Sequence, residues 1–150
     1  MLNNFINILF VPEIALSILT IVCLMYGLFS KTNSFNKATN FATLALLFTT
    51  LLVYFDFSTN FAFFDNFFSN TSFTKFFKIL ITLGAAASLI ISKNYFIDTK
   101  INKFEIPTLL LFSTLGMMIM ISSKNLMIMY LAIELQSLSL YVVASIKKDS

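Results

Sequence analysis

Long apolar runs separated by short polar connections make up most of the 150-residue chain. A membrane-spanning helix needs about 20 mostly apolar residues, and continuous runs favour helices over the alternating strands of a β-barrel. Five segments meet or approach that length, at residues 6–30, 38–55, 73–92, 106–122 and 126–146. The pattern predicts an all-α membrane protein, a bundle of five transmembrane helices that forms one domain over residues 1–150.

One connection is longer than the others and covers residues 56–72. Its sequence, DFSTNFAFFDNFFSNTS, sets phenylalanines among Asp, Asn and Ser residues. Such a segment is either an interfacial helix in the headgroup region or a covered loop, and both interpretations place it at the membrane surface.

Lysines gather on one side of the predicted bundle. With five spans the termini lie on opposite sides, and one side collects Lys31, Lys37, Lys93, Lys100, Lys103, Lys147 and Lys148. Because cytoplasmic loops carry an excess of Lys and Arg, we expect the amino terminus outside and the carboxyl terminus in the cytosol or matrix. On the sparser side, Lys75 and Lys78 are expected to snorkel to the outer interface.

Composition supports the membrane assignment and narrows the compartment. The chain is 58% hydrophobic and 11% charged, with a mean hydropathy of +0.87, whereas soluble domains carry about 25% charged residues. Phe, Ile, Asn and Lys dominate and Arg is absent, which suggests an AT-rich genome. We expect an organelle-encoded protein of the mitochondrial inner membrane, with a bacterial plasma membrane as the alternative.

The sequence lacks the residue sets that hold redox cofactors or structural metals. It contains no histidine and a single cysteine, Cys23, whereas haem, iron–sulfur and zinc sites need sets of thiolates or imidazoles. Its three glycines are too far apart for a dinucleotide-binding turn. We therefore expect no cofactor in this chain, and Cys23 is expected to be a small buried residue.

Several small or hydroxyl residues in the spans predict packing. Gly84 and Ser88 have the small-xxx-small spacing that allows close helix approach, and a ligand or ion path is the alternative. Thr49 and Thr50 are expected to bond to carbonyls one turn earlier. Glu13, behind Pro12, suits the first turn of a helix and is expected to lie within snorkelling reach of water.

Glu134 has no such route to water, because it lies about a third of the way into the last span. A charged carboxylate near the bilayer centre costs about 2.5–3.5 kcal/mol. Tyr130, Glu134, Ser137 and Tyr141 fall on one stripe of the helix by three- and four-residue spacing. The stripe indicates a proton or ion path, or a protonated group that specifies packing. No lysine is predicted deep enough to pair with Glu134, so its partner is expected on another polypeptide.

The last two spans resemble a known family. EIPTLLLFSTLGMM at 105–118 and the block around Glu-Leu-Gln-Ser-Leu at 134–138 are similar to chain 2 of proton-pumping NADH:ubiquinone oxidoreductase, respiratory complex I, the bacterial subunit N type. The resemblance is strong over residues 105–150 and weaker over 65–92. It implies the first five helices of an antiporter-like bundle, which moves protons when distant subunits transfer electrons from NADH to ubiquinone.

The resemblance also implies roles and partners. Glu134 would be the proton-path carboxylate that pairs with a lysine on a later helix, and Tyr130, Ser137 and Tyr141 would line the channel. The chain would be a non-redox subunit of the enzyme, with flavin and iron–sulfur clusters in other subunits. Its partners would be other membrane-arm subunits and lipids, with no nucleic acid.

The sequence ends at Ser150, after the fifth predicted helix, whereas the family continues into further helices that carry channel lysines. We therefore expect a second polypeptide to supply the remaining helices. Two alternatives are a structural subunit that has lost pumping and a subunit of the related cation/proton antiporter complexes.

Overall fold

Five long helices dominate the computed structural model, which describes residues 11–30, 34–55, 61–63, 68–98 and 105–146. They are α2 (Val11–Phe29), α3 (Ser34–Phe55), α4 (Ser72–Asp98), α5 (Glu105–Ser122) and α6 (Leu126–Ile146). Each is long and apolar enough to cross a membrane, which confirms the predicted all-α, multi-pass class. α4 runs on to Asp98 instead of ending at Ser92. The predicted start of the first helix, near residue 6, lies outside the described residues.

Local sequence signals determine where helices begin. Asn125 caps α6, because its Oδ1 accepts a hydrogen bond from the Met127 amide at 2.8 Å. Before α4, the Thr71 amide donates to Thr74 Oγ1 at 2.9 Å and the Thr74 amide donates to Thr71 Oγ1 at 3.3 Å. This reciprocal pair satisfies amide groups that a helix start leaves without partners.

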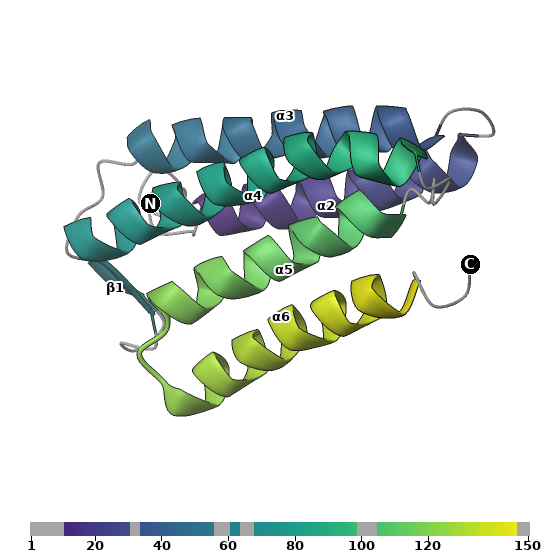
Figure 1. Ribbon diagram of the computed structural model, residues 1–150. Coiled ribbons are helices and arrows are strands. Elements are labelled where there is room, and N and C mark those ends of the chain that lie inside the picture. Colours follow the sequence, from purple (N-terminus) through teal and green to yellow (C-terminus); the bar gives the residue numbers. More distant parts are fainter. Residues whose placement is uncertain (1–10, 31–33, 56–60, 64–67, 99–104, 147–150) are drawn as a thin grey trace.

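Four of the helices form a ring around a shared apolar core (Figure 1). α2 packs against α3, α3 against α4, α4 against α5, and α5 back against α2. The core side chains come from all four helices: Leu16, Cys23, Ala38, Ala42, Leu46, Val53, Ala86, Leu89, Leu111, Leu115 and Met118. α2 and α4 therefore lie across the ring from each other, and their inward-facing side chains meet in its interior.

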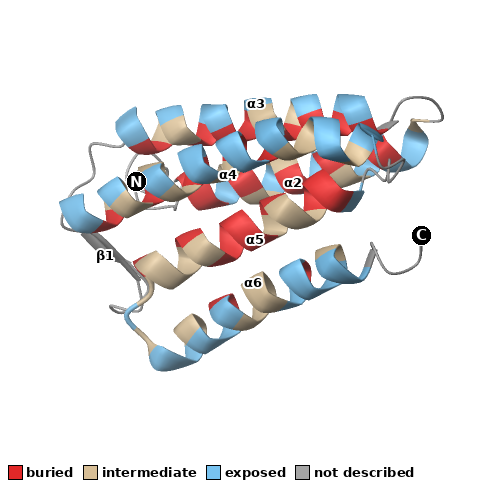
Figure 2. Cartoon of the chain, viewed as in Figure 1, coloured by how far each residue is buried: buried red, intermediate tan, exposed pale blue. Residues whose placement is uncertain are grey.

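The last helix, α6, lies outside this ring and packs chiefly against α5. Buried residues make up 56% of the α5 span but only 11% of the α6 span. Figure 2 shows the consequence, with exposed residues along most of α6 and buried residues along α5. One face of α6 is thus used within this chain and the rest is open.

Glycine allows α5 and α6 to approach closely. A Cβ atom at Gly116 would lie 3.0 Å from the Ala132 carbonyl oxygen and 3.1 Å from the Gln136 amide nitrogen. Among the described residues, no helix of this chain packs closely on Gly84 and Ser88, because both are exposed and nothing lies within 4 Å of a Cβ built at Gly84. Close packing there by a helix of another chain stays a prediction. That face of α4 points away from the ring, whereas the neighbouring Ala86 points into it.

The long connection after α3 contains a short antiparallel hairpin of β1 (Phe61–Phe63) and β2 (Phe68–Asn70). The interfacial-helix alternative is therefore wrong for these residues. Alternation of phenylalanine with small residues suits strand pairing rather than a helix. β2 contacts both α4 and α5, and Figure 1 places the hairpin at the end of the bundle where α4 begins and α5 ends.

Two smaller predictions are confirmed. Cys23 is fully buried in the core. The Thr49 and Thr50 hydroxyls each lie 2.8 Å from the Leu46 carbonyl oxygen, one turn earlier in α3.

Candidate functional site

A buried ion pair joins α2 to α4 near one end of the ring. The Lys78 ammonium contacts Glu13 Oε1, and the two side chains are only 4% and 8% exposed. Burying two charges removes both from water, and the Coulomb attraction between them offsets that penalty only when the geometry is good. The pair is therefore a costly feature, and an ionisable pair within membrane helices is a candidate functional site.

Three helix ends bring this site together. Glu13 lies in the first turn of α2 and Lys78 in the second turn of α4, on opposite sides of the ring. Ser122 is the last residue of α5. Its hydroxyl donates a hydrogen bond to Glu13 Oε1 at 3.1 Å. Lys78 and Ser122 thus bind the same carboxylate oxygen from two different helices.

The second carboxylate oxygen of Glu13, Oε2, lacks the partners that Oε1 has. Glu13 Oε2 is buried and has no hydrogen-bond donor among the described residues. A carboxylate can accept several hydrogen bonds, so a buried oxygen without one is unusual and carries a desolvation cost. The oxygen can accept a proton without displacing either existing partner.

Hydroxyl groups continue from Lys78 along the buried face of α4. Thr74, Lys78 and Thr82 repeat at four-residue spacing and are all buried. The Thr82 hydroxyl donates to the Lys78 carbonyl oxygen at 2.9 Å, and the Thr50 hydroxyl of α3 lies 2.8 Å from Thr82 Oγ1. Beyond this point the ring interior is filled by the apolar core, with Leu16 and Leu46 fully buried.

The structure corrects two predictions at this site. Glu13 and Lys78 do not snorkel to water, because both side chains turn into the ring and pair with each other. Lys75 differs: it is only partly buried, and its ammonium lies 5.9 Å from the centre of the Tyr54 ring. The pair cannot be predicted from either span alone, because Glu13 and Lys78 belong to different helices. The repeat of Thr74, Lys78 and Thr82 was the available signal that Lys78 lies on an inward face.

Glu134 and its stripe lie on the open side of α6. Tyr130 and Tyr141 are 62% and 68% exposed, and Glu134 and Ser137 are half-buried. Ala132 and Ser139 are the buried residues of this helix. Because a helix turns by about 100° per residue, Glu134 points roughly opposite to Ala132. The four predicted site residues share a face, and that face points away from this chain's own ring.

The structure therefore does not bring Glu134 together with Glu13 and Lys78. Within the described residues, Glu134 has no ion pair or hydrogen bond to another side chain, and the deeply placed Lys78 pairs with Glu13 instead. The side of α6 that faces α5 carries Ala132, Gln136 and Ser139.

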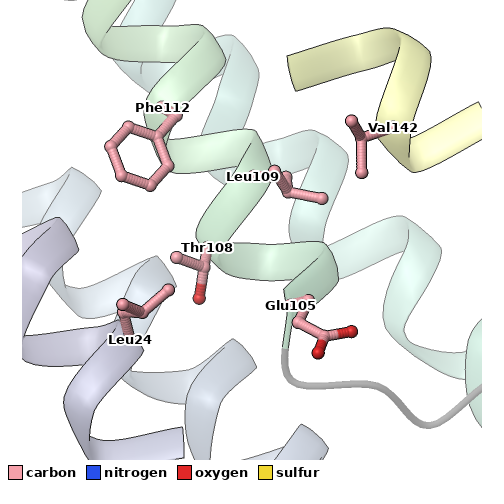
Figure 3. Close-up of a pocket in the computed structure, with 6 residues that line it drawn as sticks. All are labelled: Leu24, Glu105, Thr108, Leu109, Phe112 and Val142. Carbon is pink, nitrogen blue, oxygen red and sulfur yellow. The ribbon is translucent and has the colours of Figure 1, made fainter. Parts of the chain in front are cut away.

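A cavity of about 210 Å³ opens toward the other end of the bundle, between α2, α5 and α6 (Figure 3). Its wall consists of Leu24, Glu105, Thr108, Leu109, Phe112 and Val142. Four of these side chains are apolar, so the cavity suits hydrocarbon or a neighbouring apolar side chain better than a proton path.

Sequence comparison identifies the relatives of this bundle. No protein-family model matches the chain. NADH-quinone oxidoreductase subunit N of Bartonella bacilliformis is 39% identical over 143 residues, which are 95% of this chain and 29% of the relative. Over most of its length the chain is similar to part of subunit N. The proteins of the same name from Pelagibacter ubique and Rhodospirillum rubrum are 42% and 38% identical, over 92% and 93% of this chain.

The match to subunit N extends well beyond the segment that carried the resemblance. Alignments over 92–95% of the chain include α2 to α4, where the sequence alone gave a weak likeness. The chain spans 29% of the length of these subunit N relatives.

Proposed function

We propose that this chain contributes to proton translocation coupled to electron transfer from NADH to quinone, as the amino-terminal part of an antiporter-like membrane subunit. Its relatives are named as subunits of NADH-quinone oxidoreductase. The chain itself would be a non-redox subunit, with flavin and iron–sulfur clusters in its partners.

The position of Glu134 is the observation that carries this proposal. The carboxylate lies eight residues into α6, about 12 Å along the helix axis, on the face opposite α5. A charge at such a depth costs about 2.5–3.5 kcal/mol unless it has a partner, a proton or water. The open face flanked by Tyr130 and Tyr141 leaves room for a helix that supplies one.

The remaining helices of a subunit N-like protein are the proposed occupants of this face. A lysine there, about 6 Å from Glu134 at an effective dielectric constant of about 20, would attract the carboxylate by about 2.8 kcal/mol. Forming or breaking that pair would change how firmly the lysine holds its proton. The second polypeptide expected to carry these helices stays a prediction.

Orientation and compartment are part of the proposal. The described Lys37 and Lys93 lie at the end of the bundle opposite Glu13, where Lys93 Nζ donates to Asn40 Oδ1 at 2.8 Å. In the sequence, seven of the ten lysines are predicted on this side of the membrane, and that excess supports placing it on the cytoplasmic or matrix side, with the amino terminus outside. The relatives are bacterial proteins, and the mitochondrial inner membrane stays a prediction from composition.

The test is Glu134→Gln in the intact complex reconstituted into vesicles. The ratio of protons translocated to NADH oxidised is expected to fall, because the amide keeps the size of the side chain and removes its charge. Glu105→Gln is the matched control, since it makes the same change at an exposed residue at the start of α5. A normal ratio in an assembled Glu134→Gln complex would refute the proposal and leave a structural role.

A further inference from the structure

We propose that Glu13, Lys78 and Ser122 form a second proton-binding site in this chain, separate from the Glu134 stripe. The site lies at the end of the ring where α2 and α4 begin and α5 ends. This inference rests on the proposed function in one respect only, that the chain belongs to a proton-translocating complex.

The burial of the pair is the first support. Replacing a buried ion pair by apolar residues of similar size is often neutral or stabilising, so such a pair is weak support for a purely structural role. Glu13 and Lys78 are both more than nine-tenths buried within membrane-spanning helices, where the penalty for each charge is large. Holding α2 and α4 together does not by itself explain why two charges are buried at this cost in desolvation free energy.

The geometry of the carboxylate is the second support. Oε1 contacts Lys78 and accepts the Ser122 hydrogen bond, while Oε2 is buried without a donor among the described residues. A proton from water adds to Oε2 and forms one O–H bond, which changes the charge of the pair from zero to plus one. Release of the same proton to water breaks that bond and restores the ion pair.

The surroundings limit the side from which protons arrive. Glu13 and Ser122 lie within one turn of the ends of their helices, next to the end of the bundle where β2 contacts α4 and α5. Toward the bundle centre, the hydroxyls of Thr82 and Thr50 give way to the apolar core. The site therefore lies close to the aqueous phase at its own end and is separated from the other end by the apolar core.

Two other lysines lie near this end. Lys75 lies over the Tyr54 ring, and Lys124 is exposed in the connection after Ser122. No other Asp or Glu lies among the described residues of α2, α3 or the first four turns of α4. Glu13 is thus the only carboxylate among these described residues, and Glu134 lies outside the ring on α6.

The experiment uses the intact complex in vesicles, with the double variant Glu13→Gln, Lys78→Met. Removing both charges avoids leaving one of them buried alone, so assembly is expected to persist. The ratio of protons translocated to NADH oxidised is expected to fall. Lys75→Met is the matched control, because it removes the lysine three residues earlier on α4, and its ratio is expected to equal that of the wild type. A wild-type ratio in the assembled double variant would overturn the proposal.

A second measurement does not depend on assembly of the double variant. In infrared difference spectra of the complex during turnover, the carbonyl band of a protonated carboxyl group is expected to shift in Glu13→Asp and to persist in Glu134→Gln. Absence of any band that responds to Glu13→Asp would overturn the proposal. The two sites are tested separately. A wild-type proton ratio in Glu134→Gln alone rejects the path along α6 and leaves the Glu13 site in place. A wild-type proton ratio in the double variant alone rejects only the Glu13 site.

Discussion

Substitution of Gly116 by alanine is expected to force α5 and α6 apart. A Cβ at this position would meet the Ala132 carbonyl oxygen at 3.0 Å and the Gln136 amide nitrogen at 3.1 Å, whereas ordinary van der Waals contact begins at 3.4 Å. Both neighbouring atoms belong to the backbone of α6, so they cannot move aside as a flexible side chain could. The helix as a whole has to shift by a few tenths of an ångström.

The size of the effect follows from two opposing terms. Overpacking of a well-packed contact costs about 1–3 kcal/mol. Alanine is a better helix former than glycine by about 0.8–1.0 kcal/mol. Gly84→Ala is the matched control, because nothing lies within 4 Å of its added methyl group and only the second term applies. The free energies of unfolding of the two variants should differ by about 1–3 kcal/mol, with Gly116→Ala the less stable.

The assay is unfolding of the chain in mixed micelles, followed by circular dichroism as the mole fraction of SDS rises. Gly84→Ala should unfold at the same or a higher SDS fraction than the wild type, and Gly116→Ala at a lower one. Equal stability of the two variants would refute the close contact between α5 and α6 and the helix packing derived from it.

Three further substitutions test other contacts. Lys78→Met leaves the buried Glu13 charge without its partner and should cost about 3–5 kcal/mol, which the added Glu13→Gln change should largely restore in the same unfolding assay. Asn125→Ala removes the cap of α6 and should cost about 1 kcal/mol, with hydrogen exchange rising only in the first turn of that helix. Thr82→Val removes the hydrogen bond with Thr50 and should lower stability by about 1 kcal/mol, and an unchanged value would show that this bond contributes nothing.

Predictions that depend on one helix at a time agree with the structure. The spans follow from apolar runs, the Thr49 and Thr50 hydroxyls bond within their own helix, and Cys23 is buried. Predictions that depend on which face meets which helix fail more often. Among the described helix contacts, α6 approaches closely at Gly116, and no helix of this chain does so at Gly84.

At the candidate sites too, features of a single helix could be predicted and contacts between helices could not. Tyr130, Glu134, Ser137 and Tyr141 share a face, as helical spacing predicts, but only the packing of α6 on α5 shows that this face is open. Glu13 and Lys78 are 65 positions apart, and nothing in the spacing of either span points to the other. Lys78 would snorkel to water if α4 stood alone in lipid, but in the bundle it pairs with Glu13 instead.

The membrane environment, the five spans and the similarity to subunit N could be predicted from local hydropathy and residue identities. The pairing of Glu13 with Lys78, the close approach of α5 and α6, and the outward direction of Glu134 follow only from the packing of the helices. The physical reason is that lipid solvates every apolar face of a helix equally well. Which faces meet is therefore decided by shape and by the few polar groups that must find partners, and both depend on how all the helices pack together.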